Sequence, residues 1–159
     1  MILARWIRLE RDCLAAFAGF ARVQSARAAP AVLWAHTAEG NVACALVAPL
    51  KFAPGRSRRW FSWALAPLVA AYRQFGMRAY MEANAIYLSG GRVATCESLS
   101  IGECAVVVSC FLPVERDFLE ALRGRIEAQQ GWQFDNSWPS DAEREAIDDA
   151  LALEAAGAI

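Results

Sequence analysis

Three strand-like segments joined by glycine turns constrain the fold of this chain more than any other feature. The segments are rich in apolar and β-branched residues and span residues 78–88, 92–100 and 103–112. Gly90-Gly91 and Gly102 lie between them, and glycine tolerates the positive φ angles that tight hairpins require. Residues 104–108 are apolar without alternation, which is typical of a strand covered on both faces. We therefore predict an antiparallel meander whose last strand is central in its sheet.

Apolar residues at helical spacing predict four helices around this meander. The predicted helices span residues 8–27, 57–75, 114–126 and 140–156. Pro67 is expected to kink or split the second helix, because proline cannot donate a helical hydrogen bond. Ser140 and Glu143 form a capping-box pattern at the start of the last helix. The remaining predicted strands span residues 31–37 and 42–48.

Composition limits the classes of protein to which the chain can belong. A length of 159 residues suits a single domain, residues 1–159. Hydrophobic residues make up 57%, yet no apolar run is long enough to cross a bilayer. The net charge of -1 gives no general attraction to nucleic acid or to anionic membranes. Five cysteines without close pairing are typical of a reduced protein. We therefore expect a cytoplasmic protein whose partners include neither nucleic acid nor a membrane.

The predicted elements follow the order helix, two strands, helix, three strands, helix, with the helix at residues 140–156 after them. We therefore expect an α+β fold, with a mixed, mostly antiparallel curved β-sheet packed with α-helices. Gly40-Asn41 opens the second strand, Asn84 lies within the first strand of the meander, and Gly91-Arg92 follows its first turn. This order and these short motifs resemble the biotin/lipoate protein ligase family, which carries similar glycine-asparagine, asparagine-aspartate and glycine-lysine motifs.

The resemblance covers about residues 31–126 and implies a biotin/lipoate ligase-like domain, but the residues of the adenylation chemistry differ. The family has a lysine where this chain has Arg92, and an aspartate where it has Ala85. Residues 31–37 contain no glycine, so the family's phosphate-wrapping loop has no counterpart. The planar guanidinium of arginine does not replace a compact ammonium at a fitted site. We therefore expect no adenylate-forming activity.

Reactive side chains are scarce in this sequence. Lys51 is the one lysine and His36 the one histidine, so a site of several histidines is excluded. No cysteine pair has the spacing of a zinc site, and we expect neither a metal nor another cofactor. Cys96 follows Arg92 by four residues, and an arginine nearby would lower the pKa of a thiol. Arg92 and Cys96 are therefore candidate catalytic residues for acyl transfer without ATP, although a buried structural cysteine explains the same pattern.

The resemblance also implies a ligand groove beside the glycine turn. The residues expected to border it are Trp34, Gly40, Asn41, Asn84, Gly91 and Arg92. Residues 129–139 combine two tryptophans, a phenylalanine and several amides between two predicted helices. Such a segment can line a ligand pocket, or it can be a loop that its aromatic residues hold against the core. Both interpretations remain open from the sequence.

Three functions are compatible with these sequence features. The preferred one is a degenerate ligase-like domain that binds an acyl or biotin-like ligand, or a lipoyl/biotinyl carrier domain, without forming an adenylate. The alternative is a residual lipoyl, octanoyl or biotin ligase or acyltransferase that acts through Arg92 and Cys96 or with a partner subunit. The third is a structural or interaction protein. A homodimer is compatible with all three.

Overall fold

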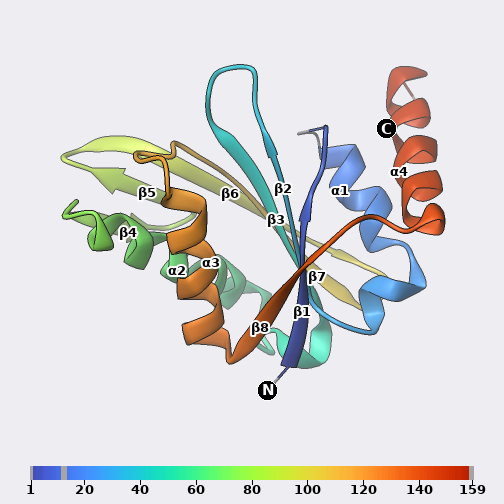
Figure 1. The fold of residues 1–159 in the computed structure, drawn as a ribbon, viewed down its shortest axis with the longest axis horizontal. Coiled ribbons are helices and arrows are strands. Elements are labelled where there is room, and N and C mark those ends of the chain that lie inside the picture. The colour runs from blue at the N-terminus through green and yellow to red at the C-terminus, as the bar shows by residue number, and fades with distance from the viewer. Residues whose placement is uncertain (1, 12–13, 158–159) are drawn as a thin grey trace.

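The computed structural model describes residues 2–11 and 14–157 and shows an eight-stranded sheet with helices against both faces (Figure 1). The strands are β1 (Ile2–Arg8), β2 (Ala31–His36), β3 (Val42–Pro49), β4 (Ala79–Glu82), β5 (Ala85–Leu88), β6 (Gly91–Ile101), β7 (Cys104–Phe111) and β8 (Trp132–Ser137). The helices are α1 (Leu14–Ala21), α2 (Trp60–Gln74), α3 (Phe118–Gln130) and α4 (Asp141–Ala155). Three short 3-10 helices are η1 (Gln24–Arg27), η2 (Leu50–Phe52) and η3 (Ser57–Arg59).

The strands are ordered β4-β5-β6-β7-β3-β2-β1-β8 across the sheet. β1 pairs in parallel with β2 and with β8, and the other neighbouring strands are antiparallel. The predicted α+β fold with a mixed, mostly antiparallel sheet is therefore confirmed. β7 and β3 lie at the centre, and every residue of β3 is buried. The central position predicted for residues 103–112 is also confirmed.

The sheet separates two hydrophobic cores, because alternate residues of a strand point to opposite faces. Val42, Cys44 and Leu46 of β3 pack toward α2 and α3, whereas Ala43, Ala45 and Val47 pack toward α1 and α4. α1 and α4 approach each other closely at Gly19. A Cβ atom at this glycine would lie 2.7 Å from the carbonyl oxygen of Ala146. Glycine therefore permits the close contact of the two helices on this face.

The two strands at one end of the sheet were not predicted from the sequence. Residues 8–27 were predicted as one helix, but the structure ends β1 at Arg8, and its first helix, α1, is Leu14–Ala21. Residues 12 and 13 of the predicted helix lie outside the described residues. Residues 129–139 were predicted as a connection, but they contain β8, in which Trp132 and Phe134 are buried. Both strands depend on parallel pairing with segments distant in the sequence, so no local turn signal announces them.

Two local predictions also need correction. Residues 78–88 were predicted as one strand, but they form the β4–β5 hairpin, in which Ala83 has a positive φ of 54°. No glycine marks this turn, which is why the sequence concealed it. Pro67 does not split α2, which continues from Trp60 to Gln74. The capping box is confirmed, because Glu143 N–H donates to Ser140 Oγ and Ser140 N–H donates to Glu143 Oε1.

Candidate functional site

Arg92 lies at the start of β6, where a β-bulge interrupts the alternation of side chains. Arg92 pairs with Tyr87 of β5, whereas Ala94 pairs with Ile86. β6 therefore holds one more residue than β5 at this point. Cross-strand partners share a face of the sheet. Arg92 thus lies on the face of Tyr87, while Ala94 lies on the face of Ile86.

Cys96 lies on the opposite face from Arg92, in the core that contains Ile86 and Ala94. Its side chain is 1% exposed. Burial raises the pKa of the Cys96 thiol to about 12, and the nearby carboxylate of Glu97 contributes in the same direction. The expectation that Arg92 lowers this pKa is therefore wrong. The bulge directs the arginine to the other face, and burial favours the neutral thiol, so the site offers no thiolate nucleophile near neutral pH.

Asn84 fastens the β4–β5 turn to β6. Its side-chain Nδ2 donates to the carbonyl oxygen of Cys96 over 3.0 Å, and the Cys96 N–H donates to the Asn84 carbonyl oxygen over 2.9 Å. These two bonds hold the turn beside the strand that follows the bulge. The structure therefore assigns Asn84 a role in shaping the hairpin, and its contact with a ligand stays a prediction.

Trp34 lies far from Cys96 across the sheet. The strand pairing places Cys96, Ser109, Cys44 and Trp34 in one row across β6, β7, β3 and β2. Three strand spacings separate Trp34 from Cys96, which corresponds to about 14 Å. The two residues therefore face the same core but do not form one site.

The indole N–H of Trp34 has no hydrogen-bond acceptor among the described residues. The guanidinium of Arg8 lies 5.2 Å from the Trp34 ring centroid, and the His36 ring meets the indole edge to face at 5.4 Å. Among the described residues, Trp34 Nε1 is buried without a hydrogen-bond partner. A buried donor of this kind costs about 1–3 kcal/mol when unpaired. Trp34 therefore carries an unused donor, but its burial keeps that donor from the surface that a ligand would reach.

The face of the sheet beneath α2 and α3 is filled by side chains. A cavity of about 20 Å³ remains between Cys44, Ser109, Leu122 and their neighbours. This volume holds about one water molecule. A ligand of the size of an acyl chain would fit there only if the helices moved. The packed core therefore leaves too little space for such a ligand between the sheet and these two helices.

The face that carries Arg92 is open beyond β7. α1 packs on this face as far as β7. On this face the side chains of β5, of β6 and of the end of β7 are exposed or half-buried, and we call six of them the open face: Tyr87, Arg92, Thr95, Glu97, Val108 and Cys110. The ring of Tyr80 on the edge strand stacks on Tyr87 with centroids 5.6 Å apart. The open face therefore combines an aromatic pair with one cation and one carboxylate.

The structure brings two of the predicted turns to the same end of the sheet. β3 and β6 lie on either side of β7 and are both antiparallel to it. The Gly40-Asn41 turn before β3 and Gly91-Arg92 at the start of β6 are therefore two strands apart, about 10 Å across the sheet. Lys51 follows the opposite end of β3, about 24 Å away at 3.4 Å per residue. The single lysine cannot take the place of the family's reactive lysine.

Two other kinds of site find no support in the described part of the chain. Within residues 2–11 and 14–157, no group of three or more His, Cys, Asp or Glu side chains could hold a metal ion. Among the helices of the same residues, none is both long and apolar enough to cross a membrane.

Comparison with known proteins identifies solved structures with the same fold. No family model and no curated protein sequence matches the chain. A Thermoplasma acidophilum protein described as a lipoate protein ligase, with bound lipoic acid, superposes with a TM-score of 0.79 and 10% identity over 95% of each chain. A bi-partite lipoate protein ligase from the same organism, studied with its E2 lipoyl domain, gives a TM-score of 0.77 and 10% identity, covering 96% of this chain and 93% of that one.

This chain has the fold of the lipoate and biotin protein ligases. The biotin branch is represented by the biotin acetyl coenzyme A carboxylase synthetase of Helicobacter pylori with bound biotinylated ATP. That enzyme has a TM-score of 0.59 and 10% identity, covering 98% of this chain and 83% of its own. The ligase-like fold therefore extends beyond the residues 31–126 of the sequence resemblance and includes the unpredicted strands β1 and β8.

Proposed function

We propose that this ligase-like domain binds a lipoyl or biotinyl carrier domain, with its acyl or biotin-like group, and does not form an acyl-adenylate. The observation that carries the proposal is the exposed open face around Arg92, where an aromatic pair lies beside a cation. Small-molecule sites, in contrast, are concave and enclose most of the ligand. An exposed aromatic pair beside an arginine suits contact with a protein surface, because interfaces are enriched in tyrosine and arginine. Tyr80 and Tyr87 supply that pair.

The chemistry of the site supports the absence of adenylation. Adenylate formation needs backbone N–H donors and a fitted cation at the phosphate. The sequence resemblance would put the family's glycine-rich loop before the Gly40-Asn41 turn, but the chain there forms β2 (Ala31–His36), whose backbone pairs with β1 and β3. Arg92 replaces the lysine, and Lys51 lies at the opposite end of the sheet. The phosphate would therefore meet neither the loop nor the ammonium that the reaction requires.

Mass spectrometry tests the adenylation part of the proposal. The protein is incubated with ATP and, in separate samples, lipoate, octanoate or biotin, beside an active lipoate ligase as positive control. We expect no acyl-adenylate from the protein. We expect the same result for Arg92→Lys, because the lysine alone does not restore the missing loop. Adenylate above background with the native protein would refute this part of the proposal.

Nuclear magnetic resonance titration tests the carrier-domain part. The labelled protein is titrated with an E2 lipoyl domain in lipoylated and unmodified forms. We expect resonance changes on the open face and at least tenfold weaker binding for Arg92→Glu. The matched control is Arg58→Glu, a charge reversal at an exposed site in η3. Absence of binding, or equal weakening by both reversals, would count against the open face as the contact surface.

The alternative function through Cys96 has its own test. An acyl-thioester would form only if the thiol reached the acyl donor and lost its proton. The burial of Cys96 and its pKa of about 12 oppose both conditions. We expect no thioester on Cys96 after incubation with octanoyl-coenzyme A. A trapped adduct at this residue would favour a residual acyltransferase instead.

A further inference from the structure

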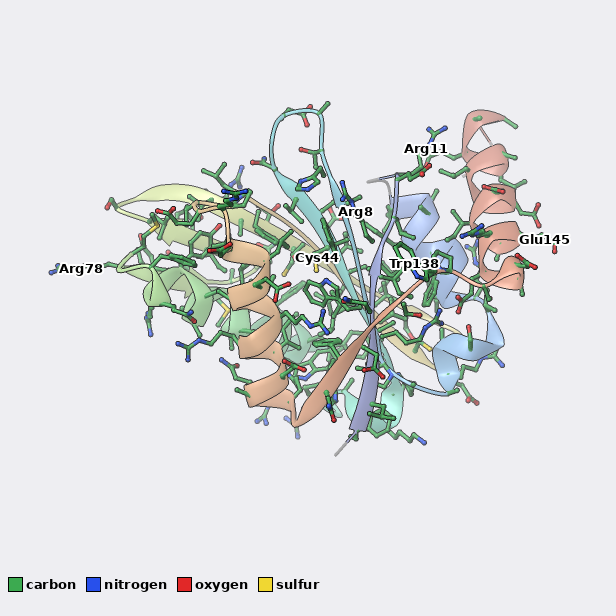
Figure 2. All side chains as sticks on the ribbon, in the orientation of Figure 1. Arg8, Arg11, Cys44, Arg78, Trp138 and Glu145 are labelled. Carbon is green, nitrogen blue, oxygen red and sulfur yellow. The ribbon has the colours of Figure 1, made fainter. Side chains whose placement is uncertain are left out.

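A groove at the other side of the molecule belongs to neither the open face nor the filled core. It has a volume of about 910 Å³ and lies between the end of β1, the end of β2, α1, α4 and the turn before α4. None of the open-face residues lines it. Figure 2 shows Arg8, Arg11 and Trp138 on this side, with Arg78 at the far end of the molecule. The volume is in the range of small-ligand sites.

The floor of the groove is apolar. Leu9 of the segment after β1 and Ile147 of α4 are buried, and Leu151, one turn further along α4, is half-buried. The segment after β1 and helix α4 supply these side chains, and both pack in the same hydrophobic core, which holds the floor in place. Such a floor accommodates a hydrocarbon chain or a ring by removing its apolar surface from water.

Two arginines present their guanidinium groups at the rim of the groove. Arg11 and Arg144 line it together with Glu10 and Asp148. Among the described residues the one ion pair joins Arg5 and Glu143, so neither guanidinium group lies within ion-pair distance of a described carboxylate. Arg8 also borders the groove, but its guanidinium lies over the ring of Trp34, which packs against the core on the other face of the sheet. Arg11 and Arg144 therefore offer planar donors to an anionic group.

One wall of the groove is an exposed tryptophan on a fixed turn. The Trp138 side chain is 75% exposed. Its carbonyl oxygen accepts a hydrogen bond from Arg5 Nη2 over 2.9 Å, and Arg5 is itself held by the buried Glu143. The Trp138 indole is therefore held in contact with water by a fixed backbone and does not pack in the described core. Exposed aromatic surface of this kind is typical of binding sites.

We infer that this groove binds an amphipathic anion, namely an apolar chain or ring that ends in a carboxylate or phosphate. The apolar body lies on Leu9 and Ile147 beside the Trp138 indole. The anionic end meets the guanidinium groups of Arg144 and Arg11 at the rim. The site is separate from the open face, so its ligand and a carrier domain can be bound together. The inference does not depend on the function proposed for the open face.

Isothermal titration calorimetry with chosen probes tests the inference. Octanoate and octyl phosphate carry both the chain and the anion, octanamide carries the chain alone, and inorganic phosphate carries the anion alone. We expect both amphipathic anions to bind at least tenfold more tightly than octanamide or phosphate, because only they use floor and rim together. Equal binding of octanoate and octanamide would overturn the role of the rim.

Variants locate the bound probe. Arg144→Ser is expected to weaken octanoate at least tenfold, and the indole N–H resonance of Trp138 is expected to shift on binding in the native protein. Arg78→Ser, at the far end of the molecule (Figure 2), is the matched control and is expected to leave octanoate affinity unchanged. Both arginines are exposed, and thermal melting confirms that each variant is folded. Equal weakening by Arg78→Ser, or a silent Trp138 resonance in the native protein, would overturn the inference.

Discussion

Replacing Glu143 with glutamine is expected to lower the free energy of unfolding at pH 7 by about 3 kcal/mol. Glu143 is fully buried at the start of α4 and accepts a two-point contact from Arg5, with Nη2 2.8 Å from Oε1. Ser25 Oγ and the Ser140 backbone N–H donate to the same carboxylate. These hydrogen bonds to the Glu143 carboxylate join β1, η1 and α4, which are far apart in the sequence. Glutamine keeps the shape but removes the charge that these donors face.

The magnitude follows from the pKa of the carboxyl group. Burial alone would raise the pKa of Glu143, but the hydrogen bonds from Arg5, Ser25 and Ser140 and the charge of Arg5 hold it at about 2, below its usual 4.5. At 1.36 kcal/mol per pKa unit, the gap corresponds to about 3 kcal/mol. Because the pKa is lowered in the folded state, this stabilisation is complete above pH 4.5. It is lost as the pH falls through 4.5 toward 2.

Urea unfolding of native protein and variant at pH 7, 5, 4 and 3 measures the effect. We expect the difference in unfolding free energy to narrow below pH 4.5, because protonated Glu143 resembles glutamine. Near pH 7 the melting temperature of Glu143→Gln is expected to fall by roughly 6–12 °C. Glu145→Gln, exposed on the same helix (Figure 2), is the matched control and should change little at any pH. A difference that persists unchanged at pH 3 would refute the electrostatic explanation.

Three further perturbations test the fold and the site. Gly19→Ala should destabilise the protein by about 1–3 kcal/mol in urea unfolding, because the new Cβ would lie 2.7 Å from the Ala146 carbonyl oxygen. The control Gly124→Ala has no atom within 4 Å of the new Cβ and should stabilise the protein by up to about 1 kcal/mol. Ala83→Gly should stabilise by about 1 kcal/mol, since the native φ is 54°; a loss of stability would contradict the strain. Cys96 should resist alkylation at pH 8 until the protein unfolds, as judged by mass spectrometry.

Several parts of the fold were readable from the sequence because they depend on neighbouring residues. The capping box of Ser140 and Glu143 requires two side chains three positions apart, and it forms as predicted. The turns at Gly90 and Gly102 have positive φ angles of 81° and 57°, as hairpin glycines should. The absence of a lysine beside Gly91 was likewise evident without coordinates, and it argues against adenylation on its own.

The candidate site was less readable, because its geometry depends on pairing between strands. Arg92 and Cys96 are four residues apart and were expected to lie near each other, but the bulge opposite Tyr87 directs them to different faces. Trp34 seemed close to the hairpin in the resemblance, yet three strand spacings lie between it and Cys96. A one-residue insertion in a strand changes which face a side chain occupies. No local pattern in the sequence announced that change.

The sequence by itself determined the last two strands of the meander, the helix start at Ser140, the fold class and the lack of a reactive lysine. Tertiary structure alone decided that Glu143 meets Arg5, that Cys96 is buried and that Arg8, Trp138 and α4 enclose a groove. The physical reason is the range of the forces concerned. Turns and caps are settled by hydrogen bonds within a few residues, whereas burial and charge pairing arise only when distant segments pack together.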